Sequence, residues 1–317
     1  MGTAMNHRIS HIRKSRRGAA LLAVLWLIAI LAMACMTALH VISFDMQIAG
    51  AKIHGSRARQ LAEMGIAVGC NPAVKRIDPI LRQLNGDTGE GFEVRIASEG
   101  GRFNINSLLL QGEKPFLTNI FCDWGIDPKD AQAIVDCLTD WVDADDNVSL
   151  NGAEKNEYEK LGRVNQPFNR PFYNLDEMRL VLGMDLVERA RPDWRNWFTV
   201  WSGGALDLNE ADAELIAVAA ETTTDRAAVI PETVRGPDGQ LDTEDDARFT
   251  NASTALDLLG INTNARPDLI KRFTVNDATT RIESIGYAQG AKCKIIVIVR
   301  NRTGKPALLE RTEEIIP

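Results

Sequence analysis

The sequence predicts an α+β fold in which a long N-terminal helix packs on a small antiparallel sheet, with an all-helical domain inserted between the strands. Three observations predict it. An uncharged apolar run near the N-terminus leads directly into a segment with helical spacing. Two regions with the alternation typical of strands, 91–106 and 281–299, lie far apart in the sequence. The more than 170 residues between them have mostly helical patterns, so one sheet interrupted by a helical insertion is the simplest architecture.

The first element is an apolar helix long enough to cross a bilayer. Residues 19–39 are 21 residues without a charge, which make roughly 30 Å of helix. By the positive-inside rule, the cations in front of this run place the rest of the chain outside the cytoplasm. No acid accompanies these cations, which are Arg8, Arg13, Lys14, Arg16 and Arg17.

Three interpretations of this N-terminus compete. A cleaved secretory signal should have an apolar region of only about 7–15 residues, followed by a small-residue cleavage site. A plain signal anchor needs no cleavage. A prepilin-type leader is cut in front of the apolar helix, after a glycine, and Gly18 stands between Arg17 and the run that starts at Ala19. The order of basic leader, glycine and apolar helix favours this third interpretation.

The helix is expected to continue beyond the membrane without a break. Between residues 45 and 71, apolar side chains recur at helical spacing among charged ones, and Pro72 is a natural stop. One long helix, half in lipid and half packed on a globular head, therefore fits the first 71 residues.

Strand patterns follow in two places. Residues 91–98 and 103–106 alternate around Glu99-Gly100-Gly101, which predicts a hairpin packed on the preceding helix. Near the C-terminus, 281–287 and 293–299 flank a turn at Gln289-Gly290. The second of these runs is apolar on both faces, as expected of a central strand.

The pattern between the two strand regions predicts short helices. Pro128 opens one that runs to Trp141, and Asn174 caps another that ends at Gly183. A helix at 215–218 is expected to be capped by Asn209, and one more covers 256–261. Segments 174–182 and 207–219 look like sterile-α-motif or helix-hairpin-helix units, but their acidic flanks argue against binding of nucleic-acid phosphates.

Charge and motif content exclude several classes of function. Five of the 36 lysines and arginines precede Ala19 and none of the 43 acids does, so a chain that begins there has a net charge of −12. Such an acidic chain should not bind nucleic acid through a broad basic face. The sequence has four histidines, of which only His54 falls in the predicted head, and no GxSxG, Walker or GxGxxG pattern. We therefore expect no enzyme.

Five cysteines are present, and Cys35 is expected to be a small apolar filler of the membrane helix. The other four belong to the exported part, where disulfides persist. Cys122 and Cys137 flank one predicted helix and are candidates for a disulfide that would link its two ends. Four cysteines allow three connectivities, so the sequence does not settle the pairing.

Two acidic clusters are candidate calcium sites, because closely spaced carboxylates can converge on a hard cation that takes six to eight oxygens. In both, a solvated acidic loop is the alternative, and neither has the spacing of an EF-hand. The first cluster contains Asp140, Asp143, Asp145, Asp146 and Glu154. The second contains Asp238, Asp242, Asp245 and Asp246, after the turn Gly236-Pro237.

Several motifs together resemble a known family, the type II secretion minor pseudopilins called general secretion pathway protein K. The resemblance spans most of the chain and is weakest from 222 to 250. Any one of the motifs is weak evidence, but they occur in the order of the family. They are 17–22 with Trp26, 101–108, 140–146, 152–154 with Tyr158, 171–181, and 207–211.

The resemblance implies a cut between Gly18 and Ala19 by prepilin peptidase, with methylation of the new amino group. Major pilins carry glutamate at the fifth mature position, whereas this chain has Ala23 there. A buried carboxylate in lipid is costly without a partner, so its absence is consistent with a subunit that sits first, at the tip.

The resemblance also implies an assembly and a location. Partners would be the I- and J-type minor pseudopilins, other pseudopilins, prepilin peptidase and the inner membrane, with the head in the periplasm and calcium bound to it. A minor subunit of a type IV pilus or competence system, or a signal-anchored periplasmic binding module, are the alternatives. The implied domains are a leader 1–18, a membrane helix 19–44, a head 45–106 and 271–317, and a helical insertion 107–270 with an acidic loop 235–246.

Overall fold

The computed structural model describes residues 17–263 and 265–316, so residues 1–16 of the predicted leader 1–18 lie outside the described residues. The chain divides into two compact units, Met1–Ser56 and Arg57–Pro317. Helix α1, Arg17–Cys70, contributes to both and ends two residues before Pro72, as predicted. In the described residues α1 is the one helix long and apolar enough to cross a membrane. Its window of highest apolarity has a mean hydropathy of 2.5 and is not covered by other residues.

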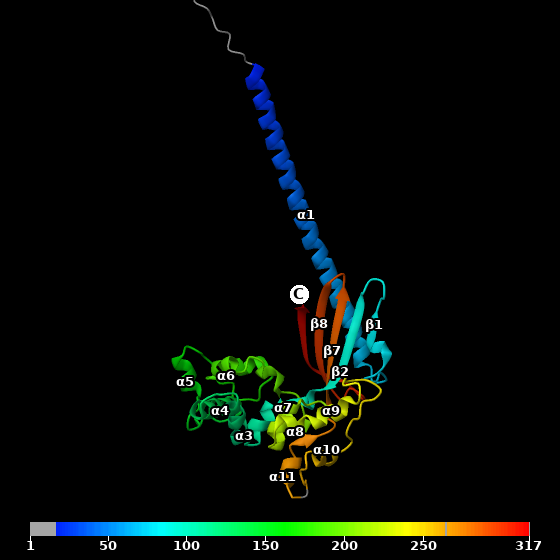
Figure 1. Cartoon of the computed structure of the whole chain (residues 1–317). Coiled ribbons are helices and arrows are strands. Elements are labelled where there is room, and N and C mark those ends of the chain that lie inside the picture. The colour runs from blue at the N-terminus through cyan, green and yellow to red at the C-terminus, as the bar shows by residue number, and fades with distance from the viewer. Residues whose placement is uncertain (1–16, 264, 317) are drawn as a thin grey trace, which may run out of the picture. The chain divides into compact units, whose positions relative to one another are not determined.

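The second unit contains a five-stranded antiparallel sheet (Figure 1) with the order β1-β2-β7-β8-β9. Figure 1 shows β2, in cyan, beside β7, in orange, although β2 ends at Ser98 and β7 begins only at Thr279. The fold class predicted from the sequence is confirmed, and β8 lies between two strands as its apolar run indicated. The strands are β1 Arg82–Leu84, β2 Gly91–Ser98, β7 Thr279–Ala288, β8 Ala291–Arg300 and β9 Ala307–Ile316.

The last turns of α1 pack on one face of this sheet. Ala58 and Ala62 are fully buried there with Ile282 and Ile295. A Cβ atom at Gly286 would lie 2.0 Å from the Ala58 carbonyl oxygen, so only glycine allows the helix to approach the strand this closely.

Arg302, in the turn between β8 and β9, fixes the end of α1. Its side chain is 8% exposed and donates to the carbonyl oxygens of Gly69, Asn71 and Val74 at 2.6–2.8 Å. These carbonyls lie at and just beyond the helix C-terminus, where a cation is favourable. Burial lowers the pKa of this guanidinium.

Short helices fill the sequence between β2 and β7. Their common core contains Trp141, Trp194 and Tyr158, all with no exposed surface, and the Trp141 ring packs edge-on against Tyr158. The 3₁₀ turns of the unit are Pro79–Leu81, Glu99–Gly101, Leu175–Leu180 and Trp194–Asn196. The helices are α2 Ile105–Leu110, α3 Lys114–Asp123, α4 Pro128–Val142, α5 Lys155–Lys160, α6 Met184–Ala190, α7 Ala213–Ala220, α8 Thr224–Ala227, α9 Val229–Arg235, α10 Ala252–Leu258 and α11 Pro267–Ile270.

The predicted hairpin 91–106 is wrong. Strand β2 pairs instead with β1 and β7, and the chain then leaves the sheet. Phe103 and Asn104 form β3, which pairs in parallel with β4, Phe198–Thr199, and Ile105 starts α2. A second parallel pair joins β5, Leu206–Asp207, to β6, Phe273–Thr274. Phe103 and Ile105 are apolar because they enter the core of the helical region, not because they face α1.

Local predictions for the helices had mixed outcomes. Asn174 caps as predicted, accepting a hydrogen bond from the Glu177 amide, but the segment it starts is a 3₁₀ turn. Asn209 does not cap α7, whose N-cap residue is Asp212. The Asn209 side chain instead donates to the carbonyls of Phe249 and Val275 and so ties two later loops together.

Candidate functional site

The first acidic cluster lies in the loop between α4 and α5. Asp140, on α4, has no exposed surface and accepts a hydrogen bond from the Ser149 amide at 3.0 Å. Gly152 packs against it, since a Cβ there would lie 1.9 Å from Asp140 Oδ2. Glu154 follows, with only 2% of its surface exposed. The loop therefore folds two carboxylates from the ends of neighbouring helices into the interior.

Glu154 is the least satisfied group of this cluster. Neither of its carboxylate oxygens has a hydrogen-bond donor among the described residues, and the same is true of Asp143 Oδ1. Burial, followed by the charges of Asp140, Asp143, Asp146 and Asp145, raises the pKa of Glu154 to about 7. Burial and its acidic neighbours also raise the pKa of Asp143. Lys114 acts on Asp143 from a distance, but no ion pair to Glu154 occurs among the described residues. A buried carboxylate without donors or a cation is costly, so Glu154 is the group that a cation would stabilise most.

The other two acids of the cluster are exposed, and each accepts a hydrogen bond from an asparagine. Asp145 accepts from the Asn147 amide, and Asp146 accepts from the side chain of Asn169. In the described part of the chain no three His, Cys, Asp or Glu side chains are arranged so that they could hold a metal ion as they stand. The structure thus brings the five predicted acids into one loop region but does not form a finished coordination sphere.

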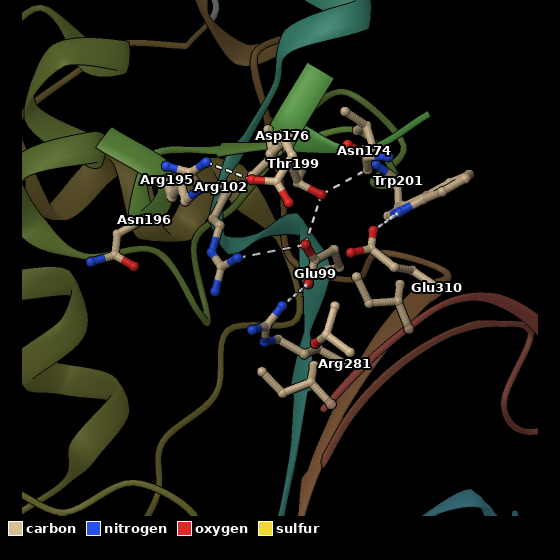
Figure 2. A pocket seen from close by; sticks show the side chains of 15 residues that line it. Glu99, Arg102, Asn174, Asp176, Arg195, Asn196, Thr199, Trp201, Arg281 and Glu310 are labelled. Carbon is tan, nitrogen blue, oxygen red and sulfur yellow. Dashed lines mark hydrogen bonds and ion pairs between the residues drawn. The ribbon is translucent and has the colours of Figure 1, made fainter. Parts of the chain in front are cut away.

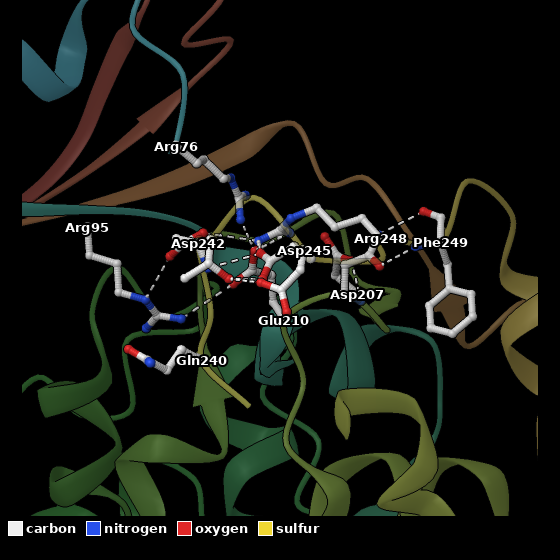
Figure 3. Close-up of polar contacts among 12 residues, drawn as sticks. Arg76, Arg95, Asp207, Glu210, Gln240, Asp242, Asp245, Arg248 and Phe249 are labelled. Carbon is white, nitrogen blue, oxygen red and sulfur yellow. Dashed lines mark hydrogen bonds and ion pairs between the residues drawn. The ribbon is translucent and has the colours of Figure 1, made fainter. Parts of the chain in front are cut away.

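Arginines pair with two of the four acids of the second cluster (Figure 3). Glu210, whose side chain is 3% exposed, stands at its centre and pairs with Arg76, with Arg248 at 2.9 Å and with Arg95 at 3.8 Å. Asp242 accepts from Arg248 at 3.2 Å. Asp246 lies 3.9 Å from the same guanidinium. Asp238 and Asp245 make hydrogen bonds within the loop. Three guanidiniums therefore occupy the place that the sequence interpretation gave to a cation.

This network also joins two parts of the unit. Arg76 and Arg95 come from the segment before β1 and from β2, whereas Glu210 precedes α7 and Arg248 follows the acidic loop. The arginines and Glu210 were missed as functional residues by the sequence interpretation. Ion pairs between residues more than 130 positions apart leave no local pattern, so only the acids of the loop stood out.

A polar cavity of about 240 Å³ is lined by residues of the sheet and of the helical region (Figure 2). Glu99 is 3% exposed and accepts from the Thr199 hydroxyl at 2.7 Å, while Arg281 and Arg102 lie 3.5 and 3.8 Å from its oxygens. At the rim, the indole of Trp201 donates to Glu310 of β9. Glu99 and Glu210 are thus two buried carboxylates that join the sheet to the helical region.

The remaining predicted residues are placed as follows. Gly18 and Ala19 fall in the first turn of α1, and nothing further is described for their side chains. Cys122 and Cys137 lie on α3 and α4 rather than flanking one helix, and both are free thiols, so the suggested disulfide is absent from the structure. Burial, reinforced by Asp140 and Asp136, raises the pKa of Cys137 to about 12, which makes this thiol unreactive.

Comparison with known proteins shows what part of the helical region is similar to. Residues 101–192 match the model of the family described as type II secretion system (T2SS), protein K. This segment contains the first acidic cluster and most of the core around Trp141. The predicted resemblance to protein K is confirmed.

Curated protein K sequences match the chain over limited regions. The protein K of Pseudomonas aeruginosa is 30% identical over 180 residues, which cover 54% of this chain and 51% of that protein. The protein K of Dickeya chrysanthemi is 41% identical over 70 residues, 22% of this chain and 19% of that protein. The alignments thus span about half or less of the length of these relatives.

A solved structure supports the fold. A chain in the crystal structure of the GspK–GspI–GspJ complex from the type 2 secretion system of enterotoxigenic Escherichia coli superposes with a TM-score of 0.55. The match covers 86% of this chain and 99% of that chain, at 15% sequence identity. The likeness shows that the long helix, the sheet and the helical insertion share the fold of that chain.

Proposed function

We propose that this chain is a minor pseudopilin at the tip of a type II secretion pseudopilus, where it initiates or caps assembly for protein export across the outer membrane. The proposal rests on one arrangement. Residues 101–192, which match the protein K model, lie in sequence between strands β2 and β7. The sheet that contains these strands packs on the end of α1, which is long and apolar enough to cross a membrane. The chain acts by assembly and has no catalytic role.

The N-terminal helix supports a single-pass position in the inner membrane with the head in the periplasm. Its uncharged run is long enough to span the bilayer, and the cations lie on one side of it. Prepilin peptidase would cut between Gly18 and Ala19. A subunit that joins a filament later carries an acid at this position, which pairs inside lipid with the subunit already in place. This chain has Ala23 instead, so its helix suits the tip, which is placed first.

Association with I- and J-type minor pseudopilins is the direct test of this function. When the full chain and its two partners are produced together in a strain with prepilin peptidase, we expect one ternary complex in mild detergent. Omission of the peptidase should abolish it, because uncleaved leaders keep the subunits from packing side by side. Independent elution of the chain in both strains would contradict a pseudopilin and favour a signal-anchored binding module.

We further propose that calcium binds at the first acidic cluster. The fit rests on the buried oxygens of Glu154 and Asp143 that lack donors, together with buried Asp140 and the rim acids Asp145 and Asp146. Calcium would supply the missing positive charge and hold the loop between α4 and α5 against the core. The second cluster fits less well, because Arg95 and Arg248 already pair with Asp242 and Arg248 lies near Asp246. Calcium there stays a prediction.

Calcium should change the pH dependence of stability. Without metal, the folded-state pKa of Glu154 is about 7, above the ordinary value of 4.5. The folded state then holds the proton more tightly, so stability falls as pH rises from 4.5 to 7, by at most about 3 kcal/mol. With calcium bound the carboxylate is ionised, so this loss should disappear. Thermal unfolding of the full chain in calcium and in chelator, between pH 5 and 8, measures both effects.

Matched variants assign this effect to a site. Glu154→Gln should raise the melting temperature in chelator at pH 8, flatten the pH dependence and remove the response to calcium. Asp238→Asn should leave the response intact if only the first cluster binds. An unchanged melting temperature in calcium and chelator at every pH would eliminate calcium from both loops.

A further inference from the structure

A second cavity opens between the sheet and the helical region, and it shares Arg102 and Arg281 with the cavity around Glu99. Its volume is about 340 Å³, within the range in which proteins bind small ligands. Its walls come from β2, β7, the segment before α7, and α9. None of these lining residues belongs to the first acidic cluster, so the cavity is separate from the proposed calcium site.

Two guanidiniums in the wall of this cavity make no hydrogen bond to the described residues. Within 4 Å of Arg102 the one carboxylate described is that of Glu99, and its distance of 3.8 Å is too long for a hydrogen bond. Burial lowers the pKa of Arg102, although the charge of Glu99 opposes this. The side chain of Arg235, at the end of α9, has neither an ion pair nor a hydrogen bond in the described part of the chain. Both arginines thus bring unused N–H donors to the cavity.

The acids that line the same cavity already have cations beside them, with one exception. Glu283 accepts a hydrogen bond from Arg281 at 2.6 Å. Glu210 is the centre of the arginine network described above, to which Arg95 of the cavity wall also belongs. Asp212 is exposed and has no ion pair among the described residues. Asp212 is therefore the lining charge that most opposes a bound anion.

We propose that this cavity binds a small, doubly charged oxyanion such as inorganic phosphate between Arg102 and Arg235. Guanidinium donors match the oxygens of phosphate in pairs, and such charge-assisted hydrogen bonds are stronger than those between neutral groups. A monocarboxylate is a poorer occupant, because it offers one charge to two cations. The bound anion would join α9 to the segment that follows β2, since the two arginines come from these elements. The site depends neither on cleavage at Gly18 nor on assembly.

Isothermal titration calorimetry of the full chain with inorganic phosphate tests this proposal, in mild detergent and in a buffer free of phosphate and calcium. We expect saturable binding to one site, and no such heat from sodium chloride at the same ionic strength. Arg102→Gln and Arg235→Gln should each raise the Kd about tenfold, because each removes charge-assisted hydrogen bonds. The matched control is Arg300→Gln, an exposed arginine outside the cavity, which should leave the Kd unchanged.

Two further results separate binding from folding. In phosphate-free buffer Arg235→Gln should melt like the parent chain, since Arg235 has no ion pair to lose, so this variant keeps the test valid even if Arg102→Gln does not fold. Asp212→Asn should lower the Kd about threefold, because it removes the opposing charge. The Asp212 side chain does not cap α7, so the exchange spares the helix. The proposal is overturned by no saturable heat from phosphate, by an equal response to chloride, by an unchanged Kd in Arg235→Gln, or by weaker binding in Asp212→Asn.

Discussion

A Glu210→Ala chain should lose about 3 kcal/mol of unfolding free energy, because it removes a buried carboxylate that three partly exposed arginines share. Glu210 is the common acceptor for Arg76, Arg95 and Arg248, and its side chain is 3% exposed. Its removal leaves three cations close together and breaks the link between the sheet and the helical region. Urea unfolding of the full chain, followed by tryptophan fluorescence, measures the loss.

The control for this prediction is an exposed network of similar composition. Glu188 pairs with Arg179 at 2.6 Å and with Arg195 at 3.7 Å, but its side chain is 32% exposed. Glu188→Ala should therefore cost no more than about 1 kcal/mol. Limited proteolysis adds an independent readout, since the loop 235–246 should become sensitive in Glu210→Ala and not in Glu188→Ala. Equal stability of the two variants would show that the Glu210 network does not join the two parts.

Arg302→Ala should have a comparable effect through a different cause. The substitution leaves the carbonyls of Gly69, Asn71 and Val74 without their charged donor at the end of α1. Hydrogen bonds to a charged group contribute about 1.5–3 kcal/mol each, and their sum overstates the effect because water enters, so we expect a loss of about 3–5 kcal/mol. Unfolding in urea again provides the measurement.

Arg300 supplies the matched control for Arg302, because it is exposed and lies two residues earlier, at the end of β8. Arg300→Ala should change the unfolding free energy by less than about 0.5 kcal/mol. Hydrogen exchange should locate the damage in Arg302→Ala, with faster exchange of amides near residue 70 than in the parent chain. Slow exchange there, as in the parent chain, would mean that sheet packing alone holds the helix end.

The Glu210 and Arg302 networks show which parts of the fold sequence patterns do not predict. The long helix, the C-terminal strands and α4 follow from periodicity, because hydrophobic spacing within 10–20 residues decides them. The path after β2 does not, because Phe103 and Ile105 alternate like a strand but are buried in the helical core. Which apolar face meets which partner depends on contacts distant in the sequence.

The candidate sites show the same limit. Both acidic loops are visible in the sequence as closely spaced carboxylates. What separates them is the set of groups around each one. Three arginines surround Asp242 and Glu210, whereas in the described part of the chain Glu154 has neither an ion pair nor a hydrogen-bond donor. Those partners come from β2, from the segment before β1 and from beyond the loop, so spacing alone could not rank the two clusters.

The mass of the mature N-terminus tests the central claim most directly. Full chain from the membranes of cells with an active type II secretion system would be analysed intact and after digestion. A minor pseudopilin should begin at Ala19, with one methyl group on its amino nitrogen, and retain the whole apolar helix. A chain that still carries its basic leader, or that begins beyond residue 39, would contradict the assignment.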